Sequence, residues 1–385
     1  MDSKAPLLIH EVLPSEIMAI IFEEHAKLEW FAPAIDGRVC RLWRQITLDT
    51  PRAWSYLKTT FRCRKRTGMS DLLTWLDRSR TAPLHITIDE DFFFNDDVKN
   101  WTLYQLLRGY TTRIASLRIV ADLPSFVDWQ DFPCMQHLEI MGLRRGLDFS
   151  RSVSWGHMPQ LRSLRLARLF VTISYTYLPA SLDGLAPLKV LVLSDGKFTS
   201  LSKHSQSLVS LMLSKVKLGD AISGSLDFPS LTYLSLYDMS DLKPHINAPR
   251  LVTCHEYSPN TYKLFPAPIH SLVEYGRYLD SYRADLTEWH DSFPNISRLS
   301  IRADAPTLVA CLDSLSIHPH LLPALQMISV GSFSRKDSAR FTEEEQGTMG
   351  DLVRVRSEAY HLDVALYFEP EKPFYIPLFF GGVSR

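Results

Sequence analysis

A short phrase with apolar residues at its first, fourth and sixth positions recurs along most of the chain. Ten copies lie between residues 114 and 330, and the middle residues are Leu117, Leu138, Leu164, Leu191, Leu211, Leu234, Cys254, Leu272, Leu299 and Ile328. Two copies are degraded, because Cys254 replaces a leucine in one and Glu274 ends the other. A single short strand cannot bury its apolar face, whereas stacked neighbours can build a continuous core. The pattern therefore predicts a solenoid of short strands whose leucines turn inward.

The spacing of the copies and their surroundings indicate the kind of repeat. The step from Cys254 to Leu272 is 18 residues and the step from Leu299 to Ile328 is 29, and the others lie between these values. A period of about 20–29 residues is typical of leucine-rich repeats, and the copies resemble degenerate members of that class. The asparagine expected three residues after the last apolar position is missing, and Leu143, Leu169, Gly196, Val216, Met239 and Asp304 stand there instead. We therefore expect irregular connections and uneven curvature in an α/β solenoid of horseshoe type.

The N-terminal stretch of residues 13–54 has a different pattern. A helix is expected to begin at Pro14, because a proline at the first helical position loses no hydrogen bond. Residues 17–22 are all uncharged, and at about 100° per residue they surround the helix. A unit of about forty residues has too little interior to bury every side of such a helix. The alternative is a self-contained three-helix core, but the surplus favours an interface with a partner.

A second helix is expected after residue 37. Val39, Leu42, Trp43 and Ile46 recur at helical spacing, which predicts one buried stripe with the neighbouring arginines off it. The Thr50-Pro51 pair then interrupts the chain, and we expect Trp54 to anchor a short third helix.

This stretch resembles the F-box family. The resemblance is carried by Leu13-Pro14, Glu16-Ile17, Ile20-Ile21-Phe22, Val39-Cys40, Trp43-Arg44 and Thr50-Pro51 followed by Trp54, and the segment VCRLWRQITLDTPRAW is similar to F-box proteins of fungi. Asp36-Gly37 departs from the family pattern, since glycine costs a helix about 1 kcal/mol relative to alanine. The resemblance implies a small three-helix domain that docks on a Skp-type adaptor through Leu13, Pro14, Ile17, Ile20, Ile21, Val39, Cys40 and Trp43.

Four regions follow from these patterns. We expect an F-box domain in residues 1–60, connecting helices and an N-terminal cap in 61–110, the repeat domain with its C-terminal cap in 111–368, and a tail in 369–385. The cap includes an apolar helix over 71–80, a strand at 84–88 and a helix ending near Arg108. A charged helix over 342–358 and the strand-like YHLDVALYF segment close the other end. The basic run FRCRKR at 61–66 reads as a solvated linker or, alternatively, as a nuclear address.

Charge and cysteine content narrow the function classes. The formal net charge of −1 favours neither nucleic acid nor an anionic membrane as partner. Five scattered cysteines show no metal-ligand spacing, which predicts reduced thiols in a cytoplasmic or nuclear protein. No run reaches the roughly eighteen apolar residues that span a bilayer, and the N-terminus has no secretory pattern.

Catalytic spacing is not found in the sequence. The most suggestive group is Cys254-His255-Glu256, but adjacent residues of a strand point to opposite faces, so Cys254 and His255 should not meet. Cys254 also occupies a core position of the repeat. We therefore expect a protein that is not an enzyme and holds no cofactor or metal.

The residues that flank each middle leucine should face away from the core, along the concave side of the sheet. In chain order these pairs are Ser116 and Arg118, His137 and Glu139, Ser163 and Arg165, Val190 and Val192, Ser210 and Met212, Tyr233 and Ser235, Thr253 and His255, Ser271 and Val273, Arg298 and Ser300, and Met327 and Ser329. Candidate target-binding residues among them are Arg118, His137, Glu139, Arg165, Tyr233, His255 and Arg298. The arginines suit an acidic or phosphorylated segment; alternatively they only keep the face solvated.

The resemblance implies a substrate adaptor of a Skp–cullin–F-box ubiquitin ligase, which binds the Skp adaptor, through it a cullin, and an unidentified target protein. The alternative is a repeat scaffold whose F-box works outside a ligase.

Overall fold

The computed structural model describes residues 13–60, 68–89, 107–120, 132–142, 158–168, 182, 184–198, 201–218, 226–239, 246–257, 265, 268–279, 286–318, 320–332, 341–360 and 365–368. The chain divides into two compact units. Unit 1 comprises residues 1–174 and 184–186, and unit 2 comprises residues 175–183 and 187–385. Both are built on parallel strands that follow one another in chain order, so the class is mixed α/β with a parallel β-solenoid.

Unit 1 begins with a group of short helices. They are α2 (Ser15–Leu28), α3 (Ala32–Asp36), α4 (Arg41–Leu48) and the 3-10 helix η1 (Pro51–Ser55). Helix α2 starts one residue later than predicted, because Pro14 precedes it and its carbonyl accepts the N–H groups of Ile17 and Met18, each at 3.1 Å. Helix α3 was not predicted. The core between these helices consists of Met18, Phe22, Ala26, Ile46 and Ala53.

An aromatic cluster joins this group to helix α5 (Gly68–Arg78). The ring of Trp75 on α5 lies 4.9 Å from that of Trp54, 5.9 Å from Trp30 and 6.1 Å from Phe31, measured between centroids. Trp54 is buried, as predicted for the anchor of the third helix. Helix α5 begins at Gly68, ahead of the predicted start, and the basic run at 61–66 lies outside the described residues.

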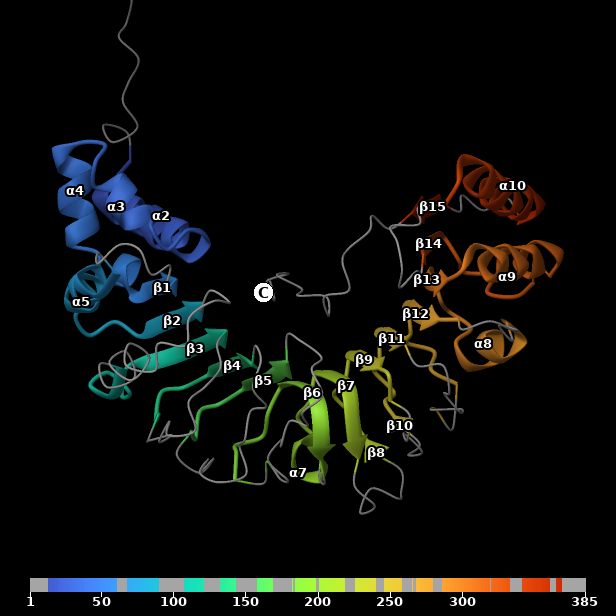
Figure 1. The fold of residues 1–385 in the computed structure, drawn as a ribbon, viewed down its shortest axis with the longest axis horizontal. Coiled ribbons are helices and arrows are strands. Elements are labelled where there is room, and N and C mark those ends of the chain that lie inside the picture. The colour runs from blue at the N-terminus through green and yellow to red at the C-terminus, as the bar shows by residue number, and fades with distance from the viewer. Residues whose placement is uncertain are drawn as a thin grey trace, which may run out of the picture. The chain divides into compact units, whose positions relative to one another are not determined.

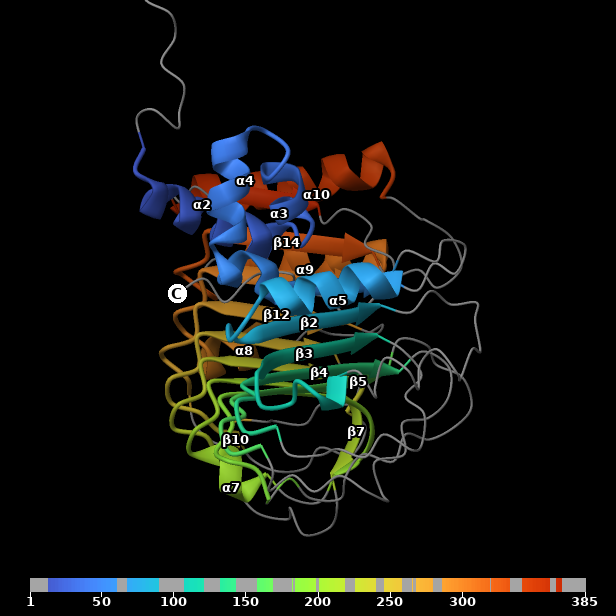
Figure 2. The same cartoon turned by 90° about the vertical axis from the view of Figure 1, so that its left-hand side faces the viewer.

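Five parallel strands complete the part of unit 1 that the structure describes. They are β1 (Tyr56–Thr60), β2 (Leu84–Asp89), β3 (Ile114–Val120), β4 (His137–Gly142) and β5 (Ser163–Arg168), paired in that order. Figure 2 shows β2 to β5 one after another, with α5 near β2. The register aligns Leu57, Ile86, Leu117, Leu138 and Leu164, all buried. Strand β1 was not predicted, and it makes residues 56–60 part of the sheet.

Within its described residues, unit 2 holds eight parallel strands. They are β6 (Val190–Phe198), β7 (Ser210–Leu218), β9 (Tyr233–Tyr237), β11 (Thr253–Tyr257), β12 (Glu274–Tyr278), β13 (Arg298–Ala303), β14 (Met327–Ser332) and β15 (Ala365–Phe368). A side sheet of two short strands, β8 (Leu226–Asp227) and β10 (Ile246–Asn247), lies in the connections. The strand predicted in YHLDVALYF is therefore present as β15, paired with β14.

One predicted repeat is out of register. The residue of β12 that aligns with Cys254 and Leu299 is Tyr275, whereas we expected Leu272. The steps along the chain become 275 − 254 = 21 and 299 − 275 = 24, which are more even than the predicted 18 and 27. Tyr275 suits the core because its hydroxyl donates a hydrogen bond to Glu256 Oε2 at 2.9 Å, so its polar end is satisfied.

The asparagine of the standard repeat is missing in unit 2. Other polar side chains form hydrogen bonds with the backbone of the segments that connect its strands. In the connection that carries α7 (Ser202–Ser205), buried His204 accepts the Leu188 N–H at 3.2 Å through Nδ1 and donates to the Leu182 carbonyl at 3.1 Å through Nε2. Asp304, at one expected asparagine position, instead caps helix α9 (Ala305–Ile317) by accepting the Thr307 N–H at 2.9 Å.

Helices cover one side of strands β12 to β15 (Figure 1). They are α8 (Leu286–Ser292), α9 and α10 (Glu343–Tyr360), and α10 confirms the predicted C-terminal helix. Buried Arg356 of α10 donates to the carbonyls of Leu315, Leu321 and Leu322 at 2.8, 2.6 and 2.9 Å, which ties α10 to the end of α9. Within the described ranges no helix is long and apolar enough to cross a membrane. The predicted helix over 96–108, apart from its end, and the tail 369–385 lie outside those ranges.

Candidate functional site

Helix α2 has two apolar faces. Met18, Phe22 and Ala26, spaced four residues apart, form the face that packs into the helix core. Ile17, Ile20 and Ile21 lie on the other side and stand exposed, with 56% of the Ile20 surface accessible. The predicted surplus of apolar surface on this helix is therefore present.

The prediction of one buried stripe after residue 37 is wrong. Ile46 is buried and Trp43 packs against the helix core, but Val39 and Leu42 remain 59% and 45% exposed. Val39 is exposed because α4 begins after it. Cys40 caps the helix, and its Sγ accepts the Trp43 N–H at 3.4 Å. Val39 thus precedes the helix, and the buried face of α4 is narrower than the spacing suggested.

These residues belong to a larger group of exposed apolar side chains on the N-terminal helices. We call it the apolar helix surface, consisting of Ile17, Ile20, Ile21, Leu28, Phe31, Ile35, Val39 and Leu42. Eight of the fifteen exposed large apolar side chains in the described part of the chain lie in this short stretch. Contiguous exposed apolar patches usually mark an interaction site, and the concentration of eight such side chains within residues 17–42 favours one here.

The eight residues predicted to contact a Skp-type adaptor fall into two groups. Pro14, Ile17, Ile20, Ile21 and Val39 are exposed and available to a partner. Leu13, Cys40 and Trp43 are half-buried; Leu13 and Trp43 pack against the helix core and Cys40 caps α4. Residues Leu42, Ile35 and Phe31 were missed, because Leu42 was assigned to the core and α3 was not foreseen.

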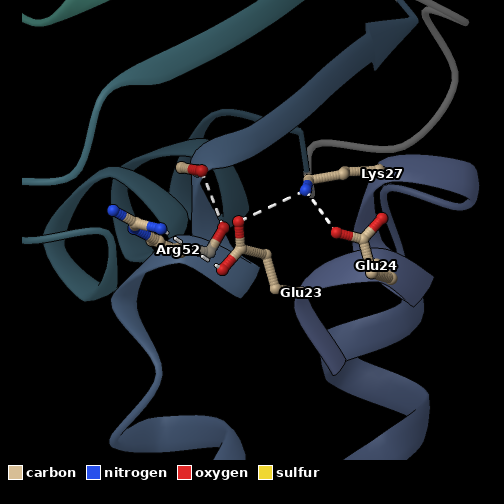
Figure 3. Close-up of polar contacts among 5 residues, drawn as sticks. Glu23, Glu24, Lys27 and Arg52 are labelled. Atoms are coloured by element: carbon tan, nitrogen blue, oxygen red, sulfur yellow. Dashed lines mark hydrogen bonds and ion pairs between the residues drawn. The ribbon is translucent and has the colours of Figure 1, made fainter. Parts of the chain in front are cut away.

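Charged residues surround parts of this surface. Arg38, Arg41 and Arg44 are exposed beside Val39 and Leu42, and Arg44 Nε donates to the Gly37 carbonyl at 2.9 Å. Figure 3 shows the opposite, C-terminal part of α2, where Lys27 pairs with Glu23 and Glu24 and Arg52 of η1 reaches Glu23 at 3.9 Å. The side of the surface near α4 is therefore basic, while the end of α2 is tied by ion pairs to η1.

The face of the unit 1 strands that turns away from the core carries a second candidate site. Arg118, Glu139 and Arg165 stand side by side in the register on β3, β4 and β5. Glu139 Oε2 lies 3.5 Å from Arg118 Nε, and Glu139 Oε1 lies 3.2 Å from Arg165 Nη1. We call this group the Arg–Glu–Arg cluster. The structure thus brings together three predicted residues, but the two arginines share a carboxylate that the sequence did not assign to them.

Two histidines lie in the adjacent row of the same face. The ring of His85 stacks on Tyr56 with centroids 4.7 Å apart, and His137 follows on β4. Desolvation lowers the pKa of His85, with a further contribution from His137, and desolvation followed by Arg162 lowers the pKa of His137. Both rings are therefore neutral near pH 7, and the positive charge of this face comes from its arginine and lysine side chains.

Unit 2 carries a comparable arrangement on its open face. His255 Nε2 lies 3.5 Å from Glu274 Oε1, and Arg298 Nη1 lies 3.7 Å from Glu274 Oε2. We call it the His–Glu–Arg cluster. Glu274 was missed because the predicted register placed Ser271 and Val273 there, whereas Ser271 Oγ donates to the carbonyls of Pro249 and Leu251.

Aromatic residues pack around His255. Its ring stacks parallel to Tyr257 and lies tilted against Tyr233, with both centroids 5.9 Å away, and the Tyr257 hydroxyl lies 3.2 Å from His255 Nδ1. A Cβ added to Gly276 on the next strand would lie 2.3 Å from His255 Nδ1. The absence of a side chain at Gly276 therefore lets the imidazole lie across the sheet.

Cys254 and His255 lie on opposite sides of the sheet, as strand alternation predicted. Cys254 is fully buried, and desolvation followed by the charge of Glu256 raises the pKa of its thiol well above the usual value. His255 contacts Glu274 on the other face. These two residues are therefore not arranged as a nucleophile and a base. Within the described ranges, no three His, Cys, Asp or Glu side chains gather as a metal site would require.

The candidate sites are therefore two surfaces of different chemistry, one apolar on the helices and one charged on the open face of the strands. Cys63, one of the five cysteines, lies outside the described residues. A scan against protein-family models and a search of curated proteins give no match to this chain.

Proposed function

We propose that the chain is a substrate-recognition adaptor of a Skp–cullin–F-box ubiquitin ligase. In this proposal the helices of residues 15–55 dock on a Skp-type adaptor, and the open face of the strands binds a target protein. The observation that carries the proposal is the exposure of Ile17, Ile20 and Ile21 on α2 together with Val39 and Leu42 beside α4. The resemblance of this stretch to the F-box supplies the identity of the partner.

The helices do not need the exposed residues for their own core. Met18, Phe22 and Ala26 already fill the space against Ile46 and Ala53. Burying apolar surface against a partner gains about 25 cal/mol per Å² before the costs of association are subtracted. The exposed arginines beside Val39 and Leu42 predict that the partner presents acidic residues at the rim of the contact.

The role requires no bond chemistry from this chain. An adaptor that holds two proteins at once raises the effective concentration of the target near the ligase machinery. The separate positions of the apolar helix surface and the open strand faces support a chain that binds two partners at different sites.

The test is binding of the purified chain to a purified Skp-type adaptor, measured by titration calorimetry. Replacing Ile20 and Leu42 together with glutamate introduces two charges into the proposed contact and leaves the helix core intact. Because a central interface residue contributes about 2 kcal/mol or more, one central residue of the two is enough for at least a thirtyfold loss of affinity, and both together would give roughly a thousandfold loss.

The matched control is Leu73→Glu, which charges an exposed leucine of α5 outside the proposed contact. This variant should bind the adaptor as the unmodified chain does. Equal affinity of the Ile20→Glu, Leu42→Glu double variant and the control would show that the apolar helix surface is not the docking site.

A further inference from the structure

Three arginines stand together at the start of helix α4. Arg38 lies in the turn before the helix, and Arg41 and Arg44 lie on the helix itself, one turn apart. All three side chains are exposed, and none has an acidic group within ion-pair distance among the described residues. We call this group the basic edge, and its formal charge is +3.

Most acidic residues of the neighbouring helices have other partners. The pairs are Asp36 with His25 at 3.2 Å, Asp49 with Gln45 at 2.7 Å, and Glu23 and Glu24 with Lys27. The remaining acids of α2, Glu16 and Glu29, are exposed and lie outside ion-pair distance of any arginine that the structure describes. The described part of the chain therefore does not neutralise the basic edge.

The basic edge does not stabilise its own helix. Arg41 lies in the first turn of α4, where the helix dipole disfavours positive charge. Arg41 and Arg44 are three residues apart, so their side chains are neighbours on the helix surface and repel each other. Such violations of local rules in a folded chain are expected at functional sites. Carboxylates of a partner beside these arginines would offset both unfavourable effects.

Hydrogen bonds fix the backbone that presents the basic edge. The Arg38 N–H donates to the Ile35 carbonyl at 2.9 Å, and Arg44 Nε donates to the Gly37 carbonyl at 2.9 Å. The carbonyl is a neutral acceptor, so this bond holds the turn without cancelling the charge of Arg44. Arg38 thus stands beside the exposed Val39 on a backbone that need not be ordered when a partner binds.

The charges at the ends of α2 indicate which kind of partner fits. Glu16 and Glu29 lie at the two ends of this helix, next in sequence to the exposed Ile17 and Leu28. An anionic membrane that covered the apolar residues of α2 would be repelled by these carboxylates. A protein can present carboxylates to the basic edge and other groups to α2, so the charge pattern favours a protein partner.

We propose that the basic edge selects the partner of the apolar helix surface, because carboxylates that border the docking surface of the Skp-type adaptor pair with Arg38 and Arg41 and steer its association. The inference rests on the proposed function and deepens it by naming the charge on the adaptor that this chain selects. Charges at the rim of an interface mainly change the association rate and its salt dependence, whereas most other substitutions change the dissociation rate. Arg38 and Arg41 should therefore act on association, and Ile20 and Leu42 on dissociation.

The experiment measures the association and dissociation rates of the full chain with a purified Skp-type adaptor, by stopped-flow fluorescence over a series of salt concentrations. The Arg38→Gln, Arg41→Gln double variant should associate about tenfold more slowly at low salt, while its dissociation rate changes by no more than about twofold. At about 1 M salt, where charges are screened beyond about 3 Å, the two association rates should converge.

The matched control is the Arg162→Gln, Arg250→Gln double variant, which removes the same charge from two exposed arginines outside the N-terminal helices. It should associate as the unmodified chain does. Urea unfolding provides a second readout, because the Arg38→Gln, Arg41→Gln variant should be at least as stable as the unmodified chain once the repulsion between Arg41 and Arg44 is removed. Lower stability of this variant would indicate a structural role and overturn the inference.

The kinetic outcomes separate this inference from the proposed function. Adaptor binding with equal association rates in both double variants would overturn the inference and leave the adaptor function in place. No adaptor binding by the unmodified chain would overturn both. Binding to phosphatidylserine vesicles that only the Arg38→Gln, Arg41→Gln variant loses, with unchanged association with the adaptor, would show that the basic edge serves a membrane and would also overturn the inference.

Discussion

The N-terminal helices and the parallel strands place their apolar residues in opposite ways. On the helices, Ile17, Ile20 and Ile21 remain on the outside, while Met18 and Phe22 fill the core. On the strands, the aligned leucines lie inside and the flanking residues of the open face are mostly polar. A strand alternates between two faces, so stacking buries one of them completely. The short helices around α2 cannot enclose every side of it, so apolar residues stay exposed on the helices, whereas the open face of the strands is mostly polar.

The largest effect should come from exchanging an inward residue for alanine. Leu234 of β9 is fully buried, so Leu234→Ala should lower the free energy of unfolding by about 2–5 kcal/mol. Ile20→Ala on α2 should change it by no more than about 0.5 kcal/mol, because exposed residues contribute little to stability. Urea unfolding of both variants measures the two values. Similar losses of unfolding free energy in the two variants would mean that Ile20 is as important for stability as an inward residue of the strands.

A smaller loss of stability is expected for a substitution on the open face, where the space beside a side chain, and not its burial, decides the effect. Gly276→Ala places a methyl group where the imidazole of His255 lies, so the ring must move away from Tyr257 and Glu274. We expect a loss of about 1–3 kcal/mol, as for other overpacked sites. Urea unfolding measures the loss, and NMR of the His255 ring protons reports the movement. An unshifted ring with unchanged stability would contradict the packing of this cluster.

An effect of similar size concerns the polar exception inside the strands of unit 2, the core residue Tyr275. Tyr275→Phe removes the hydroxyl that donates to Glu256 and keeps the ring that fills the core. The expected cost is about 1.5–3 kcal/mol if the acceptor is charged and about 1 kcal/mol if it is neutral, so stability should fall less than for Leu234→Ala. Equilibrium unfolding at matched pH checks this order. Improved stability of Tyr275→Phe would show that the hydrogen bond is not needed to hold a tyrosine at this repeat position.

The repeat was predictable because inward leucines leave a periodic signal. Of the ten middle residues named from the sequence, Leu117, Leu138 and Leu164 align in the register of unit 1, and six more align in that of unit 2. The prediction of Leu272 as the tenth was wrong, because the repeat pattern consists of aliphatic residues, while the core accepts Tyr275 through its hydrogen bond to Glu256. Because of this error in register, Glu274 was not predicted on the open face, and its ion pairs with His255 and Arg298 were not predicted either.

The N-terminal helices were harder to predict, because the capping residue sets where a helix begins and therefore which of its residues face the core. Helical spacing alone placed Val39 and Leu42 in one stripe with Ile46, but Cys40 starts the helix after Val39. Strand β1 was also missed, since the segment Tyr56–Thr60 reads as a continuation of the helical domain. Deleting residues 1–60 would therefore remove an edge strand of unit 1 as well as the helices, and point substitutions on exposed residues are the cleaner test.

We propose that the apolar helix surface connects this chain to a ubiquitin ligase. The most direct measurement is recovery of a cullin with the intact tagged chain, the Ile20→Glu, Leu42→Glu variant and the Leu73→Glu control, quantified by mass spectrometry. We predict that the intact chain and the control recover both a Skp-type adaptor and a cullin, and that the double variant recovers neither. Recovery of the adaptor without a cullin would instead indicate a scaffold that works outside a ligase. Equal recovery of the adaptor and the cullin by all three chains would contradict docking through the apolar helix surface.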